Sequence, residues 1–317
     1  MGLPDLGFGP MRHAAIGGLE VSIVGLGCNN FGRMLDASRS ARVVHAALDA
    51  GITYFDTADS YGEGASERYL GRALGQQIDD VVIATKFGRP TPDVGGEGGA
   101  GPEYVHSALR HSLSRLGREH VDLYQLHIPD PATPIDDTLG ALEELRDQGL
   151  IREIGVSNLD AQALQEADDA AVARGIRPFV SNQVEYSLAH RDPERNGLVS
   201  VCTDRGVALL PYYPLASGIL TGKAAGRTPT EGRLTTDRYR RFLAERYLLL
   251  ADRVSSFARE RGLTPVQVAI GWLLSRDVVP SVTPGATAPA QVAANAAASA
   301  WSPTGEDLAV LDAITLS

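Results

Sequence analysis

The chain has very little cysteine, because Cys28 and Cys202 are the only two among its 317 residues. Two cysteines exclude both a disulfide framework and a four-cysteine zinc site. Positive charge is also scarce, since 29 Lys and Arg stand against 39 Asp and Glu and leave a net charge of -10. Nucleic-acid and anionic-membrane surfaces need clustered positive charge, so neither kind of partner is expected.

Long hydrophobic runs are missing as well. No apolar stretch reaches the length of about 20 residues that a membrane-spanning helix needs. Residues 1–10 have neither a basic start nor a continuous apolar run, so we expect a loose lead-in rather than a signal peptide, and a cytoplasmic protein. What is present, 44% hydrophobic and 21% charged residues, is typical of a soluble globular protein with a full core.

Strand-like and helix-like patterns alternate along nearly the whole chain, after a hairpin predicted over residues 12–20. The predicted strands are 20–27, 52–56, 81–86, 120–127, 151–156, 179–184, 207–212 and 278–282. Helices are expected over residues 41–50, 66–74, 102–116, 134–148, 161–174, 198–205, 239–261 and 264–275, and from Pro289 and Pro303 onward.

Eight strands that are each followed by a helix predict parallel pairing, and closure at eight gives a (β/α)8 barrel. We therefore expect a single domain over residues 1–317, an α/β TIM barrel with an N-terminal β-hairpin and extra helices near the C-terminus. An open doubly wound sheet is the alternative.

Capping chemistry predicts where two of the helices begin. Thr133 is suited to the N-cap position and Pro134 to the first helical position that follows it. Thr264 and Gln267 have the spacing of a capping box.

Six consecutive predicted strands end in polar groups, at the end of the barrel where active sites lie. These groups are Asp56, Lys86, His127, Ser157-Asn158, Asn182-Gln183 and Tyr212-Tyr213. Each alone has a structural explanation: Asp56 could cap a helix, Lys86 could reach solvent and His127 could be a core histidine. The run of six favours a functional site.

Four of the residues at or near these strand ends can move a proton together: Asp56, Tyr61, Lys86 and His127. A tyrosine has a pKa of about 10 and is a poor acid at neutral pH. A lysine ammonium beside it lowers that pKa, and a carboxylate can hold the lysine in place. A histidine across the pocket can orient a substrate oxygen or relay its proton. This pattern indicates chemistry at a carbonyl or alcohol oxygen.

The chain resembles the aldo-keto reductases over residues 21–295. The segments that carry the resemblance are 55–62 (FDTADSYG), 84–88 (ATKFG), 124–127 (YQLH), 155–158 (GVSN), 182–186 (NQVEY) and 214–223 (PLASGILTGK). The resemblance implies that Tyr61 is the general acid and that Lys86 lowers its pKa. It also implies that Asp56 pairs with Lys86 and that His127 positions the carbonyl of a small-molecule aldehyde or ketone.

The same resemblance implies a nicotinamide dinucleotide that lies across the open end of the barrel, and no metal ion. Its carboxamide would be held by Ser157, Asn158 and Gln183, and Tyr212 would stack on its ring. Its pyrophosphate would be covered by a loop that contains Leu215, Ser217, Gly218 and Lys223. Arg227 and Arg233 are further candidate phosphate contacts, with solvated loop charges as the alternative.

The segment after the last predicted strand departs from the family pattern. Many members have a lysine and, six positions later, an arginine that bind the 2′-phosphate of NADPH, and Gly285 and Gln291 occupy those positions here. Each lost charge-assisted hydrogen bond is worth roughly 1.5–3 kcal/mol. Helix N-terminal amides near Thr287 could still take an anion, and Asn295 falls where the family contacts adenine. NADP(H) remains favoured, with NAD(H) or dual use as the alternative.

Three residues after the first strand would face the substrate: Asn29, Asn30 and Phe31. Cys28 is expected to be a packing residue and Asp59 a turn residue. Residues 96–101 (GEGGAG) match the dinucleotide fingerprint, but that motif must turn directly from a strand into a helix, so the match is accidental. We expect residues 89–101 to form a flexible loop over the site.

Three functions are compatible with these residues. The leading interpretation is an NAD(P)H-dependent carbonyl reductase. The second is a reductase for a sugar or polyketide intermediate. The third is a cofactor-binding interaction subunit like the potassium-channel β subunits, which share the fold and the four residues. The physiological substrate and the oligomeric state stay open.

Overall fold

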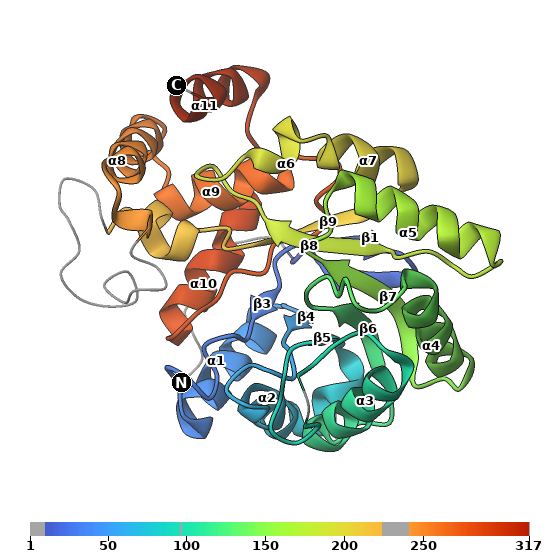
Figure 1. Ribbon diagram of the computed structural model, residues 1–317. Coiled ribbons are helices and arrows are strands. Elements are labelled where there is room, and N and C mark those ends of the chain that lie inside the picture. The colour runs from blue at the N-terminus through green and yellow to red at the C-terminus, as the bar shows by residue number, and fades with distance from the viewer. Residues whose placement is uncertain (1–9, 96, 224–240, 317) are drawn as a thin grey trace.

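Seven parallel strands in chain order form the curled sheet at the centre of the computed structural model, which describes residues 10–95, 97–223 and 241–316 (Figure 1). The strands are β3 (Leu26–Gly27), β4 (Tyr54–Asp56), β5 (Val82–Phe87), β6 (Val121–Leu126), β7 (Ile151–Ser157), β8 (Ser181–Glu185) and β9 (Ala208–Tyr212). All residues of β5 and β6 are buried, as expected for parallel strands covered on both faces.

Residues 278–285 close the sheet into a (β/α)8 barrel. The amide of Leu209 donates to the carbonyl of Val278 at 2.8 Å, and parallel bridges join Val24 to Val282 and Gly27 to Gly285. The predicted eighth strand therefore lies between β9 and β3, although it pairs through isolated bridges rather than a continuous ladder. The predicted fold class is confirmed.

The strand predicted over residues 20–27 is divided between two sheets, which corrects the sequence-based boundary. Its first half pairs in an antiparallel hairpin of β1 (His13–Ile16) and β2 (Leu19–Ser22), and its second half is β3. Apolar hairpin residues pack with inward-facing barrel residues, the whole cluster being Ile16, Leu19, Val21, Tyr54, Val82, Ala84, Leu123 and Leu210. The hairpin therefore plugs one end of the barrel, and the C-terminal ends of the strands form the other end, which we call the mouth.

Helices surround the sheet (Figure 1). They are α1 (Ala37–Asp49), α2 (Ala65–Leu74), α3 (Pro102–Leu116), α4 (Ile135–Asp147), α5 (Ala161–Ala173), α6 (Asp192–Arg195), α7 (Leu198–Arg205), α8 (Glu245–Glu260), α9 (Pro265–Leu274), α10 (Pro289–Ala297) and α11 (Gly305–Leu316). Short 3-10 helices are η1 (Gly75–Asp80), η2 (Ala216–Thr221) and η5 (Ala298–Ala300). Within the described ranges, none of the helices combines the length and the apolar character needed to cross a membrane.

Two helices begin at other residues than predicted, because nearby side chains form hydrogen bonds that the local pattern did not indicate. The Thr133 hydroxyl donates to the Asp130 carboxylate at 2.7 Å instead of capping, and Pro134 is the N-cap of α4. Helix α1 begins four residues earlier than predicted, because the carboxylate of Asp36 accepts from the Arg39 amide and caps it.

The capping box at the start of α9 is confirmed. The Thr264 hydroxyl accepts from the Gln267 amide at 3.2 Å, and the Gln267 side chain accepts from the Thr264 amide at 2.9 Å. Helix α8 begins at Glu245 rather than at residue 239, which lies outside the described residues.

Candidate active site

A buried ion pair lies at the base of the mouth. Asp56 ends β4, and Lys86 comes from the neighbouring strand β5. The Lys86 ammonium donates to both carboxylate oxygens of Asp56, at 2.8 and 2.9 Å, and to the Thr57 carbonyl at 2.7 Å. The Lys86 side chain has no exposed surface, so its ammonium needs acceptors inside the protein. These three acceptors match its three protons and hold Lys86 in place.

The surroundings of Lys86 keep it charged. Burial by itself lowers the pKa of Lys86, but the nearby Asp56 and Tyr61 raise it more, and the net pKa lies above its ordinary value. The ammonium therefore persists at neutral pH inside the protein.

Tyr61 faces both this ion pair and His127. Its ring centre lies 5.2 Å from the Lys86 ammonium, and its ring meets that of His127 edge-on, with centroids 5.7 Å apart. The three side chains come from three successive strand ends, β4, β5 and β6. The predicted constellation is therefore present as a compact group.

Lys86 lowers the pKa of Tyr61, as predicted, but the net pKa of Tyr61 is raised. Burial raises the pKa of Tyr61 most, Lys86 lowers it and Asp56 raises it, and the result lies above the ordinary value. Lys86 acts in the predicted direction, but desolvation of the phenolate is the larger effect. Tyr61 therefore keeps its proton at neutral pH, which a proton donor must do before reaction.

His127 follows β6 and is held through its main chain. Its amide donates to the Phe87 carbonyl at 2.8 Å, and its carbonyl accepts from the Asn158 side chain at 3.2 Å. Only 8% of the residue is exposed, and its ring meets that of Tyr61.

Glycine is required beside Tyr61. Gly62 has a φ of 57°, and a Cβ there would lie 2.9 Å from the Cα of Gly32 and from the Phe31 carbonyl. The loop after β3 thus packs directly on the loop that carries Tyr61. At the start of α2, the Ser66 hydroxyl also donates to the Cys28 carbonyl, in the loop after β3, at 2.9 Å.

Asp59 lies in a turn, as the sequence suggested, but it is not a surface residue. It is fully buried, and its amide donates to the Lys86 carbonyl at 3.2 Å. Burial and the neighbouring Glu67 raise the pKa of Asp59 to about 8, although Arg115 and the polar groups of Ser60 lower it. No local sequence signal distinguishes this carboxyl from Asp56, because its environment is made by α2 and α3.

Next to Asp59, Glu67 and Arg115 form a buried ion pair that joins several elements. Arg115 on α3 donates to Glu67 on α2 at 2.6 Å, and Thr85 on β5 donates to the other Glu67 oxygen at 2.5 Å. Arg115 also binds Asp93, in the loop after β5, at 3.0 Å. This network fixes the far side of the segment that carries Tyr61.

Four predicted cofactor residues form one hydrogen-bonded set that extends from the ion pair. Ser157 donates to the main chain of Gln183 at 2.7 Å, and the Gln183 side chain donates to Asp56 at 3.2 Å. Asn158 donates to the Ser157 hydroxyl at 2.9 Å and accepts from Tyr212 at 3.0 Å. The structure therefore brings all four together along the mouth.

The loop predicted to cover a pyrophosphate has an unusual backbone. Tyr213, Ala216 and Ser217 have positive φ values of 53°, 45° and 56°, and Gly218 has 105°. The Ser217 hydroxyl is buried without a hydrogen-bond partner among the described residues. Strained residues and unsatisfied buried groups are typical of ligand-binding loops, so this loop fits the phosphates of a dinucleotide.

The remaining residues of that prediction lie at the edges of the loop. Leu215 immediately precedes η2, and Lys223 is exposed just after it. Arg227 and Arg233 lie outside the described residues.

The segment that would bind the 2′-phosphate is already engaged internally. The side-chain oxygen of Gln291 accepts from the Thr287 amide at 2.7 Å and from its hydroxyl at 3.1 Å. The Thr287 amide itself is therefore not open to an anion, and binding of an anion by the other amides at the start of α10 stays a prediction. Gly285 bridges to Gly27, and Asn295 is buried on α10.

The residues predicted to face the substrate after the first strand differ in their surroundings. Phe31 is fully buried in the hydrophobic core, so it is a packing residue and the prediction is wrong for it. Asn30 is 4% exposed and donates to the Ala286 carbonyl at 3.2 Å, where it supports the closure of the barrel. Asn29 is partly exposed, and Cys28 is buried as expected.

The loop after β5 is hydrogen-bonded at both of its ends, and the flexibility expected for residues 89–101 stays a prediction. The Gly99 amide donates to the Gly88 carbonyl at 3.0 Å, and the Ala100 amide donates to Asp130 at 2.8 Å. Residue 96, which begins the fingerprint-like sequence, is not among the described residues.

Comparison with known proteins identifies the family of the chain. A sequence model of the Aldo/keto reductase family matches residues 23–315. The chain belongs to this family. Aldo/keto reductases are oxidoreductases that act on small carbonyl compounds and generally use nicotinamide cofactors, typically NADPH. The predicted family is therefore confirmed.

Three similar proteins differ in what their names state. "Probable aldo-keto reductase 1" of Glycine max is 36% identical over 284 residues, which cover 85% of this chain and 78% of the relative. Two proteins named "Probable voltage-gated potassium channel subunit beta" are 32% identical in Arabidopsis thaliana and 33% in Oryza sativa subsp. japonica. Each of these two matches spans 298 residues and 90% of both chains.

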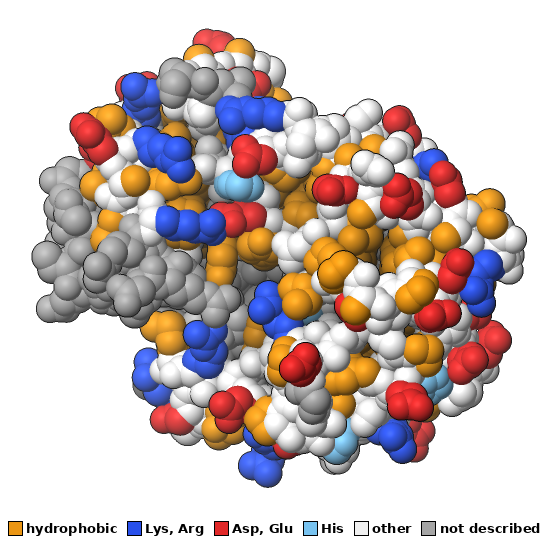
Figure 2. All heavy atoms as spheres, viewed as in Figure 1, with side chains coloured by type: hydrophobic (Ala, Val, Ile, Leu, Met, Phe, Trp, Pro, Cys, Tyr) orange, Lys and Arg blue, Asp and Glu red, His pale blue; other side chains and the backbone are white. Residues whose placement is uncertain are grey.

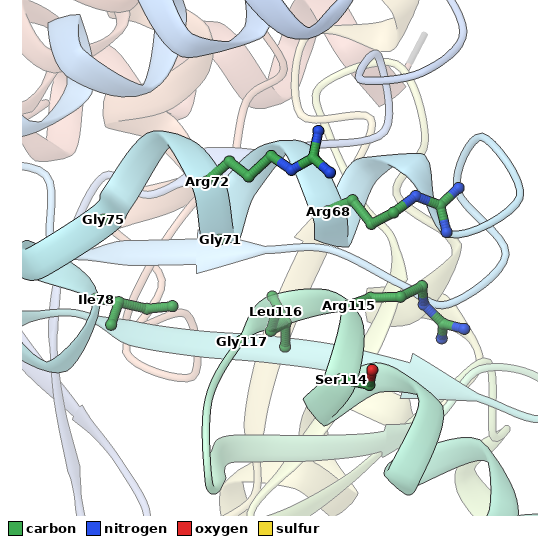
Figure 3. A pocket seen from close by; sticks show the side chains of 9 residues that line it. All are labelled: Arg68, Gly71, Arg72, Gly75, Ile78, Ser114, Arg115, Leu116 and Gly117. Atoms are coloured by element: carbon green, nitrogen blue, oxygen red, sulfur yellow. The ribbon is translucent and has the colours of Figure 1, made fainter.

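Two hollows of this aldo/keto reductase lie away from the mouth. One, of about 500 Å³, is between α2 and α3 and is lined by residues that include Arg68 and Arg72 (Figure 3). The other, of about 400 Å³, is lined by residues of α6, α8 and α11, and in Figure 2 basic side chains gather over α8 and α6. None of Asp56, Tyr61 and Lys86 lines either hollow. No cluster of three or more potential metal ligands occurs in the described part of the chain.

Proposed function

We propose that this aldo/keto reductase converts an aldehyde or ketone to the alcohol with NAD(P)H, and that Tyr61 donates the proton. The observation that carries the proposal is the buried Asp56–Lys86 pair, whose ammonium lies 5.2 Å from the ring centre of Tyr61. A permanent positive charge beside a tyrosine that is still protonated suits a group that must release its proton only during the reaction.

Each residue then has a separate task in carbonyl reduction. A nicotinamide cofactor held by the residues named below would supply the hydride for the carbonyl carbon. Tyr61 donates its proton to the carbonyl oxygen, and Lys86 stabilises the phenolate that remains, because Asp56 keeps the ammonium in place. His127, edge-on to Tyr61, orients the same oxygen and stabilises the negative charge that develops on it.

Residues on two sides of the mouth are proposed to hold the cofactor. Ser157, Asn158 and Gln183 would bind its carboxamide, and Tyr212 would stack on its ring. The strained loop around Ser217 would receive the pyrophosphate. NADP(H) is the proposed cofactor on the basis of family use, with NAD(H) or dual use as the alternative, since Gly285 and Gln291 carry no charge for a 2′-phosphate. Fluorescence titration with NADPH and with NADH decides between them.

A Tyr61→Phe variant tests the mechanism. We expect it to bind the cofactor as the wild type does and to lose carbonyl reduction, because the phenyl ring keeps the packing and removes the proton. The loss is measured with a panel of aldehydes, ketones and sugars, by following the absorbance of the reduced nicotinamide as the cofactor is oxidised. Tyr69→Phe on α2 is the control, and turnover near wild type in Tyr61→Phe would exclude the assigned role.

The second candidate is a cofactor-binding interaction subunit, which the names of two relatives favour. Size-exclusion chromatography together with the turnover assay separates the two functions. A stable oligomer that binds cofactor but turns over no carbonyl would support the interaction subunit, whereas turnover of the substrate panel would support the enzyme. The same panel distinguishes simple carbonyls from sugar or polyketide-like substrates.

A further inference from the structure

The hollow between α6, α8 and α11 is rich in positive charge, and basic side chains gather over α6 and α8 in Figure 2. Its volume of about 400 Å³ lies in the range of roughly 300–1,000 Å³ that small-molecule sites occupy. We call it the basic hollow. Its arginines are Arg191 and Arg195 from α6 and Arg246 and Arg253 from α8.

The sequence of α8 places its share of these residues on one face of the helix. Arg246, Leu250 and Arg253 follow each other at spacings of four and three residues, and residues at these spacings are neighbours on a helix surface. Leu250 is buried, whereas both arginines are exposed. The face of α8 that lines the basic hollow therefore combines two cations with an apolar centre.

Arg191 serves mainly to build the wall of the basic hollow. It is only 5% exposed, and its guanidinium donates to Glu194 at 2.9 Å, to Asp312 at 2.7 Å and to Thr315 at 2.8 Å. Since Asp312 and Thr315 belong to α11, these bonds join α6 to α11. The charge of Arg191 is neutralised by two carboxylates, and the wall that it holds is already formed without a ligand.

The outer arginines are not neutralised in this way. The Arg246 guanidinium donates to the Tyr247 hydroxyl at 3.0 Å and lies 4.7 Å from the centre of its ring, but it forms no ion pair with any residue that the structure describes. Arg195 lies 3.8 Å from Asp192, and both side chains are more than half exposed. Asp192 is the one carboxylate among the described lining residues, so the basic hollow keeps a positive charge in a chain whose net charge is -10.

The remaining wall is largely apolar. The ring of Tyr247 contributes to it and is supported by Phe242, whose ring centre lies 5.5 Å away. Aliphatic side chains from three parts of the chain complete this surface, and they are Leu188, Ala189, Leu250 and Ile314. A molecule in the basic hollow therefore meets both guanidinium groups and hydrocarbon.

We propose that the basic hollow is a second ligand site, separate from the mouth, and that it binds a small organic phosphate. Guanidinium groups match phosphate oxygens with paired N–H donors. A phosphate group carries three acceptor oxygens, so it can bind arginines of α6 and α8 together, and its organic part contacts the apolar wall. The proposal goes beyond carbonyl reduction and does not depend on it, because none of the proposed catalytic residues lines the basic hollow.

Calorimetric titration of the full-length protein with phenyl phosphate, inorganic phosphate and phenol tests the ligand class. We expect phenyl phosphate to bind most tightly, because inorganic phosphate lacks the apolar contact and phenol lacks the charge. If inorganic phosphate binds as tightly as phenyl phosphate, the apolar wall takes no part and the assigned ligand class is wrong. Equal binding of phenol would show that the arginines take no part, which overturns the proposal as well.

Two variants and a matched control locate the site. Arg195→Gln and Arg246→Gln should each raise the Kd for phenyl phosphate by about 10- to 150-fold, the range expected for the loss of charge-assisted hydrogen bonds. Arg246→Lys should recover part of that loss. Arg259 is exposed on α8 but does not line the basic hollow, so Arg259→Gln should leave the Kd unchanged.

The variants also give the results that would refute the site. Unchanged binding in both Arg195→Gln and Arg246→Gln would mean that the phosphate binds elsewhere, for example at the mouth. A loss in Arg259→Gln as large as in these two would mean that only the general charge of the surface attracts the anion. A wild type that gives no binding heat with phenyl phosphate at millimolar concentration would exclude the proposed ligand.

Discussion

The buried carboxyl of Asp59 makes the stability of this protein depend on pH in an unusual direction. Its pKa rises from an ordinary value of 3.8 to about 8 in the folded protein, chiefly through burial and secondly through Glu67. Between those values the unfolded chain has lost the proton while the folded chain retains it. Raising the pH through this window therefore favours unfolding, and the stability due to Asp59 is complete only below pH 3.8.

Asp59→Asn removes the titrating proton while keeping the size of a neutral carboxyl. Each pH unit inside the window changes the free energy of unfolding by about 1.4 kcal/mol per proton. Relative to the wild type, the variant should therefore gain at most about 3 kcal/mol in unfolding free energy between pH 5 and pH 7. A difference in unfolding free energy that is the same at every pH reports how well the new amide is accommodated. The change of that difference with pH reports the proton of Asp59.

Urea denaturation at pH 5, 6, 7 and 8, followed by tryptophan fluorescence, measures this difference. Asp80→Asn, at an exposed carboxyl in η1, is the matched control and should give a much smaller slope. Comparing each variant with the wild type at the same pH cancels the titration of all other groups. If the difference for Asp59→Asn does not change between pH 5 and pH 8, Asp59 ionises normally and the reasoning from its burial is wrong.

Two further substitutions test the loop beside Tyr61 and the cofactor segment. Gly62→Ala should destabilise the protein by about 1–3 kcal/mol, because the backbone at residue 62 has a positive φ and the new Cβ would meet Gly32. Thermal denaturation measures this change, and an unchanged midpoint would contradict the close packing. Gln291→Arg should tighten binding of NADPH relative to NADH by about 10-fold or more, because it adds a cation for the 2′-phosphate and frees the Thr287 amide. If NADPH and NADH titrate the variant as they titrate the wild type, the phosphate lies elsewhere.

Much of the site could be predicted because the carboxyl ends of parallel strands all lie at the same end of the barrel. Asp56, Lys86 and His127 each follow a recognisable apolar run, and in a closed barrel three such positions must meet at the mouth. Tyr61 lies five residues after Asp56, so it reaches the same end of the barrel. The hydrogen bonds of Lys86 then follow from chemistry, since a buried ammonium requires acceptors.

Local sequence was less informative where several elements compete for the same group. The Thr133 hydroxyl could cap a helix, but the Asp130 carboxylate is a stronger acceptor nearby and accepts its proton. The run of residues 20–27 reads as one strand, yet its first half pairs within the hairpin, and its second half joins the barrel through Leu26–Gly27 and the bridge of Val24 to Val282. Such choices depend on partners that are far away in the chain.

The sequence by itself determined the barrel, the order of its strands and the residue types at its mouth, because periodicity and strand ends are local properties. Only the tertiary structure decided which charged groups are buried or paired, and so how their pKa values shift. Tyr61 and Asp59 have raised pKa values because distant segments remove water from them, and Arg241 pairs with Glu185, which lies far from it in the chain. Desolvation and pairing depend on which segments pack together, and that is fixed when the chain folds.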